Sequence, residues 1–101
     1  MNRVLIILAI AATPAWADPE PDPAALERLV LQDCGSCHGL TLKGGLGPDI
    51  RVGALGHHDR DSLSAIILDG IPGTPMPPWR PLLNEYEAAW IAAYLLNGDH
   101  E

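Results

Sequence analysis

The pentapeptide Cys34-Gly35-Ser36-Cys37-His38 constrains this chain more than any other stretch of it. C-x-x-C-H is the attachment pattern for c-type haem, in which each cysteine thiol forms a thioether with one haem vinyl group. The histidine beside the second cysteine then reaches the iron as the proximal ligand. The motif therefore predicts one covalently bound haem c, held by Cys34, Cys37 and His38.

Other uses of two closely spaced cysteines are a disulfide in a periplasmic protein, half of a zinc site, or a chance pairing. A zinc site needs about four ligands, and the chain has no further cysteine to complete one. A thioredoxin-like redox pair is expected within a βαβ pattern, and none is visible. These considerations favour haem attachment over the alternatives.

Residues 1–17 have the pattern of a secretory signal peptide. Arg3 provides a positive charge, residues 4–12 are apolar, and Ala15-Trp16-Ala17 is a small-x-small cleavage site. A membrane anchor is the alternative, but the apolar run is far shorter than the about 20 residues that a span needs. We expect cleavage after residue 17, which leaves residues 18–101 as one small periplasmic domain.

A domain of this size has a thin core and usually needs an additional constraint to fold stably. The chain is 48% hydrophobic, yet it contains no Phe. A covalently attached, largely apolar macrocycle would fill the centre of such a domain. We therefore expect the chain to fold poorly without its haem.

The chain is acidic, with a formal net charge of −7 that becomes more negative once Arg3 is removed. This charge argues against nucleic acid or an anionic membrane as the partner. It favours redox partner proteins with a basic docking patch, since complementary charge mainly speeds encounter. The alternative is that the acidity only keeps a periplasmic protein soluble.

Three stretches combine helical periodicity with start and stop signals, over residues 23–33, 60–69 and 85–96. An Asp or Asn stands at each expected N-cap, and the third stretch begins like a capping box. No strand pattern, repeat or second domain is visible. The predicted fold is all-α, with three main helices around one haem.

Two further expectations concern the surroundings of these helices. Residues 51–58 are predicted to be irregular. This stretch ends with His57 and His58, which are expected to be solvated loop side chains; the alternative is that one of them is a second iron ligand or a docking residue. On the last helix, one face carries Tyr86, Trp90 and Tyr94, which we expect to pack in the core around the haem.

The glycine-rich loop after the motif contains Gly47-Pro48, ten residues beyond His38. A ligating imidazole normally donates its second N–H to a fixed acceptor, which orients the ring and raises its basicity. A backbone carbonyl of this loop, that of Pro48 above all, is the expected acceptor. An ordinary turn proline is the alternative.

Residues 71–81, with sequence IPGTPMPPWRP, contain five prolines and Met76. Prolines restrict the backbone, so this loop can hold one thioether sulfur in place. We therefore predict Met76 as the distal iron ligand, although a methionine in a small core is normally filler. Arg80, Arg51 or the Trp79 indole N–H are candidates to meet the haem propionates.

With these residues in place, the chain resembles the class I c-type cytochromes over nearly all of residues 18–101. The resemblance rests on the CGSCH motif, Gly47-Pro48, the Met76 loop and a final helix with the sequence WIAAYL. It implies that the first and last helices cross beside the haem and that Tyr94 lies near the ring.

The segments CGSCHGLTLKGGLGP, ILDGIPGTPMPPWRP and WIAAYLLNG resemble more narrowly the NirC cytochromes. These small periplasmic proteins accompany the haem-d1 nitrite reductase of denitrifying bacteria. The resemblance implies one of two roles, delivering electrons to that reductase or assisting the maturation of its d1-type haem.

An iron bound by both His38 and Met76 would have no open position, which favours one-electron transfer over substrate chemistry. The sequence thus predicts an electron carrier that is not an enzyme, with nitrite reductase as a plausible acceptor. An accessory protein of d1-type haem biosynthesis is the alternative. An enzyme such as a peroxidase would need an empty or labile sixth position.

Overall fold

The computed structural model of the chain describes residues 3–7, 9 and 21–98. Every regular element in these ranges is helical, so the predicted all-α class is confirmed. No helix in the same ranges is long and apolar enough to cross a membrane. The predicted cleavage site at Ala15-Trp16-Ala17 lies outside the described residues.

The first helical segment has three consecutive parts, which are α1 (Pro23–Leu29), a π turn η1 (Val30–Cys34) and α2 (Gly35–His38). The Asp22 carboxylate caps it by accepting the backbone N–H groups of Ala24 and Ala25. Proline at the first helical position suits this start, because its missing N–H would be unpaired there in any case.

The sequence predicts a helix to about residue 33 that leads into the motif on its last turn, and the helical turns continue through the whole C-x-x-C-H motif to His38. The segment ends at Gly39, which has a φ of 88°. A Cβ atom at Gly39 would lie 2.5 Å from the carbonyl oxygen of Gly44. The chain can therefore turn back beside the motif only because this position is glycine.

The prediction that residues 51–58 are irregular is also corrected, because Val52–Leu55 form the short helix α3 within this stretch. The backbone N–H groups of Ala54 and Leu55 donate to the carbonyl of Arg51 at 2.9 and 3.2 Å. Leu55 is buried. Burial of this side chain compensates for the poor helix propensity of Gly53.

The other two helices have nearly the predicted bounds. They are α4 (Arg60–Asp69) and α5 (Glu85–Asn97). The Asp59 carboxylate accepts the N–H of Ser62 at 2.7 Å, and this hydrogen bond lowers the pKa of Asp59. At the start of α5, Asn84 and Glu87 form a reciprocal capping box. Hydrogen bonds from the capping side chains thus determine where both helices begin.

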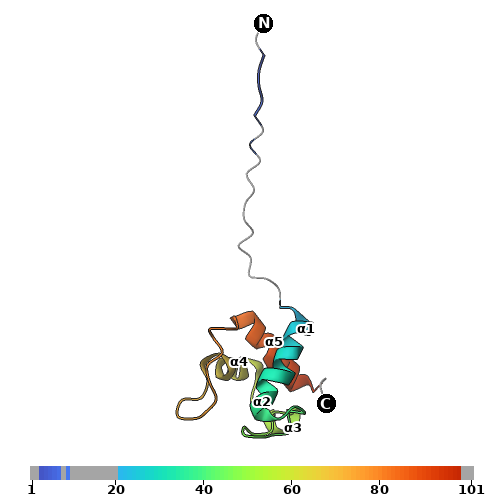
Figure 1. Cartoon of the computed structure of the whole chain (residues 1–101), viewed down its shortest axis with the longest axis vertical. Helices are drawn as coiled ribbons and strands as arrows, with labels where there is room; N and C mark the ends of the chain where they lie inside the picture. Colours follow the sequence, from blue (N-terminus) through green and yellow to red (C-terminus); the bar gives the residue numbers. More distant parts are fainter. Residues whose placement is uncertain (1–2, 8, 10–20, 99–101) are drawn as a thin grey trace.

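Helix α5 is the centre of the packing, because it contacts α1, α3 and α4 and crosses α1 (Figure 1). Its buried face consists of Ala88, Ile91, Ala92 and Leu95. The expected aromatic face is therefore only partly in the core, and Tyr86 is 65% exposed. Small residues on the buried side allow the close helix approach that a bulky aromatic row would prevent.

Among the described residues, the buried hydrophobic side chains of the core are all aliphatic. The buried side chains come from the helical elements α1, η1, α3, α4 and α5, from the loop after the motif and from the segment before α5. They are Leu26, Val30, Leu42, Leu55, Leu63, Ile67, Leu68, Leu83, Ala88, Ile91, Ala92 and Leu95. The aromatic side chains Trp79, Trp90 and Tyr94 pack against this core while remaining partly exposed.

Candidate haem-binding site

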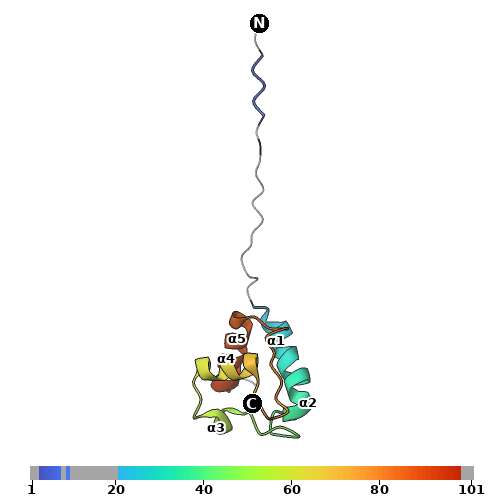
Figure 2. The same cartoon turned by 90° about the vertical axis from the view of Figure 1, so that its left-hand side faces the viewer.

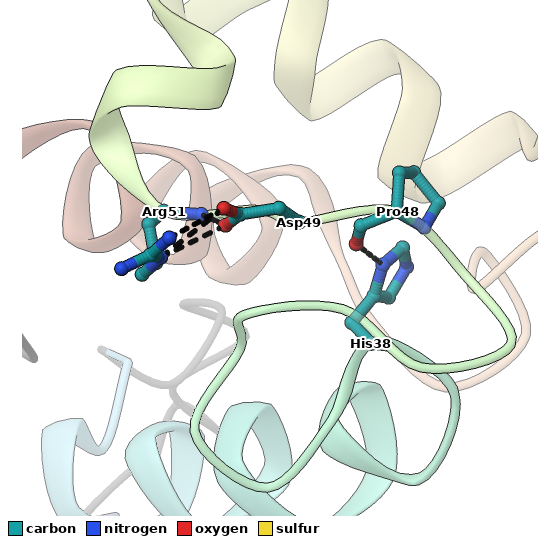
Figure 3. A network of polar contacts seen from close by, with 4 residues as sticks. All are labelled: His38, Pro48, Asp49 and Arg51. Atoms are coloured by element: carbon teal, nitrogen blue, oxygen red, sulfur yellow. Dashed lines mark hydrogen bonds and ion pairs between the residues drawn. The ribbon is translucent and has the colours of Figure 1, made fainter.

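The imidazole of His38 is held by the loop that follows it. Its Nδ1 atom lies 2.7 Å from the carbonyl oxygen of Pro48 (Figure 3). A carbonyl only accepts hydrogen bonds, so Nδ1 carries a proton, and in the neutral ring Nε2 is the nitrogen with the lone pair. The expected contact is thus present, and it selects the tautomer that a metal ligand requires.

Gly47 allows the loop to approach the ring this closely. A Cβ atom at this position would lie 2.8 Å from Cε1 and 2.9 Å from Nδ1 of His38. The backbone N–H of Gly47 also donates to the carbonyl of Cys37 at 2.7 Å, which ties the loop to the motif. The absence of a side chain at residue 47 is therefore a steric requirement of the His38–Pro48 contact.

An ion pair between Asp49 and Arg51 lies directly beyond Pro48 (Figure 3). The guanidinium hydrogen bonds lower the pKa of Asp49 to about 2. Arg51, a candidate for a propionate, thus has a carboxylate partner within the chain. Sequence reasoning missed Asp49, although an Asp side chain often accepts the backbone N–H two residues on, as it does here from Arg51.

The two motif thiols differ in their environment. Cys37 is exposed and Cys34 is half-buried, and neither forms a disulfide. Burial, followed by the charge of Asp33, raises the pKa of the Cys34 thiol to about 11. This thiol is therefore protonated at neutral pH and is a weak nucleophile in the folded chain. Within the described residues, no group of three or more potential ligands could hold a separate metal ion.

Met76 lies in the loop between α4 and α5, which extends toward the end of the molecule that holds α2 and α3 (Figures 1 and 2). The loop is folded back on itself, since the N–H of Ile71 donates to the carbonyl of Met76 at 3.3 Å. The Thr74 hydroxyl donates to the Ile71 carbonyl at 2.7 Å and accepts the Met76 N–H at 3.3 Å. These contacts restrict the backbone that carries the thioether.

Gly70 fixes the start of the same loop. A Cβ atom here would lie 2.7 Å from the carbonyl oxygen of Met76 and 2.8 Å from the backbone of Pro77. The predicted helix stop therefore has a second role, which sequence reasoning did not identify. Its absent side chain gives the Met76 segment room to pack against the end of α4.

The other residues predicted for the haem environment, Arg80, Tyr94 and Trp79, differ in their contacts. Arg80 forms an ion pair with Asp69 at 2.8 Å and lies 3.9 Å from Glu85, so it links α4 to α5. Tyr94 stacks on Trp90, with ring centroids 5.1 Å apart and an interplanar angle of 14°. Trp79 is partly buried against the core.

The histidines before α4 lie beside each other, with the ring centroids of His57 and His58 4.0 Å apart. His57 is exposed and His58 is partly buried. The backbone N–H of His58 donates to the carbonyl of Leu55 at 2.8 Å, which places the pair directly after α3.

These residues fit a haem c group by their chemistry. The site offers an imidazole with a free Nε2, two unpaired thiols on one helical segment, and a thioether on a restrained loop. Half-buried aromatic rings beside an aliphatic core provide apolar surface for a macrocycle. Cysteine thiols that can form thioethers, an imidazole and a methionine thioether are the groups that hold haem in c-type cytochromes.

Comparison with known proteins agrees with this chemistry. A family model described as cytochrome C oxidase, cbb3-type, subunit III matches residues 21–95. The chain is 53% identical to cytochrome c55X of Paracoccus denitrificans (strain Pd 1222) over the full length of both. It is 50% identical to cytochrome c55X of Pseudomonas aeruginosa, with 91% of this chain and 84% of the relative covered.

Two solved structures are also similar. One is a c-type cytochrome NirC, with a TM-score of 0.75 and 51% identity, covering 79% of this chain and 98% of that one. The other is the dihydro-heme d1 dehydrogenase NirN in complex with DHE, with a TM-score of 0.65 and 33% identity. The match to NirN covers 69% of this chain but only 15% of NirN.

Proposed function

Because the chain belongs to the c-type cytochromes related to cytochrome c55X and NirC, we propose that it carries single electrons in the periplasm to nitrite reductase. The observation that carries this proposal is the 2.7 Å contact between His38 Nδ1 and the Pro48 carbonyl, which leaves Nε2 available to iron. The similarity to NirC supports a place in the nitrite reductase system.

In this proposal Cys34 and Cys37 would hold one haem c by two thioethers, and His38 and Met76 would be the ligands of its iron. The bound haem supplies one-electron exchange between ferric and ferrous states. The chain keeps both axial ligands on restrained segments, so they move little when the charge changes. Trp79, Arg80 and Tyr94 contribute to the haem environment.

Two axial protein ligands would leave no position for a substrate, so we propose that the chain is not an enzyme. Replacing Met76 with Ala tests this point directly. The variant should lose the weak long-wavelength ferric band that is typical of methionine–iron ligation, and it should gain affinity for added imidazole. A native protein that binds imidazole equally well would contradict Met76 ligation.

We also propose that residues 1–17 direct export and are removed, and that the partner docks through a basic patch onto this acidic protein. The mass of the purified periplasmic protein tests the first part, because it reports leader removal and haem addition together. A mass equal to that of residues 18–101 plus one haem is expected. A full-length polypeptide with free thiols would contradict both the leader and the attachment.

A second candidate function is assistance in the biosynthesis of d1-type haem. The similarity to part of NirN favours it, because that protein is a dihydro-heme d1 dehydrogenase. As an accessory protein, the chain would bind maturation proteins or supply electrons to them.

A stopped-flow experiment distinguishes the two roles. The reduced holoprotein is mixed with oxidised nitrite reductase, and a deletion strain is assayed for d1-type haem. Fast reduction of the enzyme with normal d1-type haem in the deletion strain supports the carrier. Slow reduction with loss of d1-type haem supports the accessory role and overturns the first proposal.

A further inference from the structure

We propose that Asp49 and Arg51 are positioning residues for the proximal ligand, and that their ion pair holds the reduction potential of the protein below the value it would otherwise have. This inference rests on the proposed binding of iron by His38. The two residues follow Pro48 in the chain and lie outside the C-x-x-C-H motif, the Gly47-Pro48 pair and the Met76 loop (Figure 3).

The contact between the two side chains is extensive for residues only two positions apart. Nε of Arg51 donates to both carboxylate oxygens of Asp49, at 3.1 and 3.2 Å, and Nη2 donates to Oδ2 at 2.8 Å. The backbone N–H of Arg51 also donates to Oδ1 at 2.9 Å. A planar guanidinium paired in this way holds a carboxylate in one orientation, which a single point contact does not.

This pair acts on His38 through the peptide plane between Pro48 and Asp49. The Pro48 carbonyl belongs to that plane, so fixing Asp49 limits how far the carbonyl can rotate. Between the two residues of the pair, the N–H of Ile50 donates to the carbonyl of Leu42 at 3.0 Å. On the other side, Gly47 is tied to Cys37. The acceptor of the His38 proton is therefore anchored from both directions.

A fixed acceptor makes the opposite ring nitrogen more basic, because the Nδ1–H bond is polarised toward the carbonyl. A more basic ligand stabilises the ferric state more than the ferrous state, which lowers the reduction potential. Loosening the pair should weaken the hydrogen bond and raise the potential.

The charge of Arg51 alone predicts the opposite direction. Removing a positive charge near the site favours the more positively charged ferric state, which would lower the potential. The sign of the shift in an Arg51 variant therefore separates positioning from simple electrostatics.

The test is a redox titration of the holoprotein carrying Arg51→Gln, compared with Arg60→Gln. Arg60 is a matched control, because it carries the same charge and its exposed guanidinium forms a loose contact with Asp61 at 3.9 Å. We expect Arg51→Gln to raise the midpoint potential and to speed solvent exchange of the His38 Nδ1 proton, measured by NMR. We expect Arg60→Gln to leave that exchange rate unchanged.

Asp49 provides a graded second test. Asn at this position keeps an acceptor for the Arg51 N–H but loses the ion pair, whereas Ala loses both. Proton exchange at His38 should therefore be slowest in the native protein, faster in Asp49→Asn and fastest in Asp49→Ala. Because Asn preserves the turn, this variant also serves if Arg51→Gln folds poorly.

The outcomes separate this inference from the function on which it rests. A native holoprotein without histidine-ligated iron would overturn the proposed function. A native protein with intact ligation, together with an unchanged or lowered potential and unchanged proton exchange in Arg51→Gln, would overturn only the positioning role of the pair.

Discussion

At the scale of single residues, the site depends on glycine, because its missing side chain leaves room for neighbouring groups. Gly47 is the clearest case, because a Cβ atom there would enter the His38 ring. The Gly-Pro pair was predicted for its carbonyl, and that contact is present. The steric role of the glycine became visible only in three dimensions, because nothing local shows that residue 47 faces a side chain nine positions earlier.

The substitution Gly47→Ala should therefore displace the imidazole or the loop. The cost in free energy of unfolding should be about 1–3 kcal/mol, as for other overpacked sites. Gly53→Ala is the control, because a Cβ atom there meets nothing within 4 Å and lies in α3, where Ala is preferred by about 0.5–1 kcal/mol. Thermal unfolding of both variants measures the difference, and equal stability of the two would contradict the steric role.

The Asp49–Arg51 pair also predicts a pH dependence. The pKa of Asp49 lies near 2 in the folded chain, below its ordinary value of 3.8. A lowered pKa means that the pair stabilises the fold above the ordinary value and loses this contribution as the pH falls toward the folded value. Native protein should be more stable than Arg51→Gln near neutral pH, and the difference should vanish near pH 2. Denaturant unfolding over this range measures it, and a constant difference would be the contrary result.

At the scale of elements, the loop that carries Met76 is tied to the end of α4. Gly70 and Gly73 both have positive φ values, of 68° and 81°. Only Gly70 faces other backbone, since a Cβ atom at Gly73 meets nothing within 4 Å. The two glycines therefore both have a positive φ but differ in their contacts.

Replacing either glycine with Ala should cost about 1–3 kcal/mol, because a residue with a side chain is strained at a positive φ. Gly70→Ala should in addition push the Met76 segment away and weaken the long-wavelength ferric band, whereas Gly73→Ala should keep it. Optical spectra of the two holoproteins at equal haem content provide the comparison. Retention of the full band in Gly70→Ala would show that α4 does not position the methionine.

At the scale of the whole molecule, the acidic net charge leads to a prediction about association with the proposed redox partner. The formal net charge is −7 over the full sequence, and surface charges act over about 10 Å at moderate salt. A partner with a basic docking patch should therefore associate more slowly as salt screens the attraction.

Stopped-flow rates of electron transfer to nitrite reductase should fall steadily as ionic strength rises. Reduction of the same protein by a small uncharged reductant serves as the control and should change little. A rate that is independent of salt, or that rises with it, would contradict a basic docking patch.

The sequence by itself determined the features that depend on neighbours a few residues away. Examples are the caps at Asp22, Asp59 and Asn84 and the extents of α4 and α5. Caps and turns involve hydrogen bonds over two to four positions, so a short window of sequence contains both partners. The haem-attachment motif belongs to the same class of local pattern.

The tertiary structure alone decided which surfaces meet. It determined that α5 buries its aliphatic face and not its aromatic residues, that Arg80 pairs with Asp69, and that Gly70 contacts the Met76 backbone. It also carried the first helix through the motif by a π turn and formed α3 around buried Leu55. These outcomes depend on packing between elements distant in sequence, where burial of apolar surface outweighs local propensity.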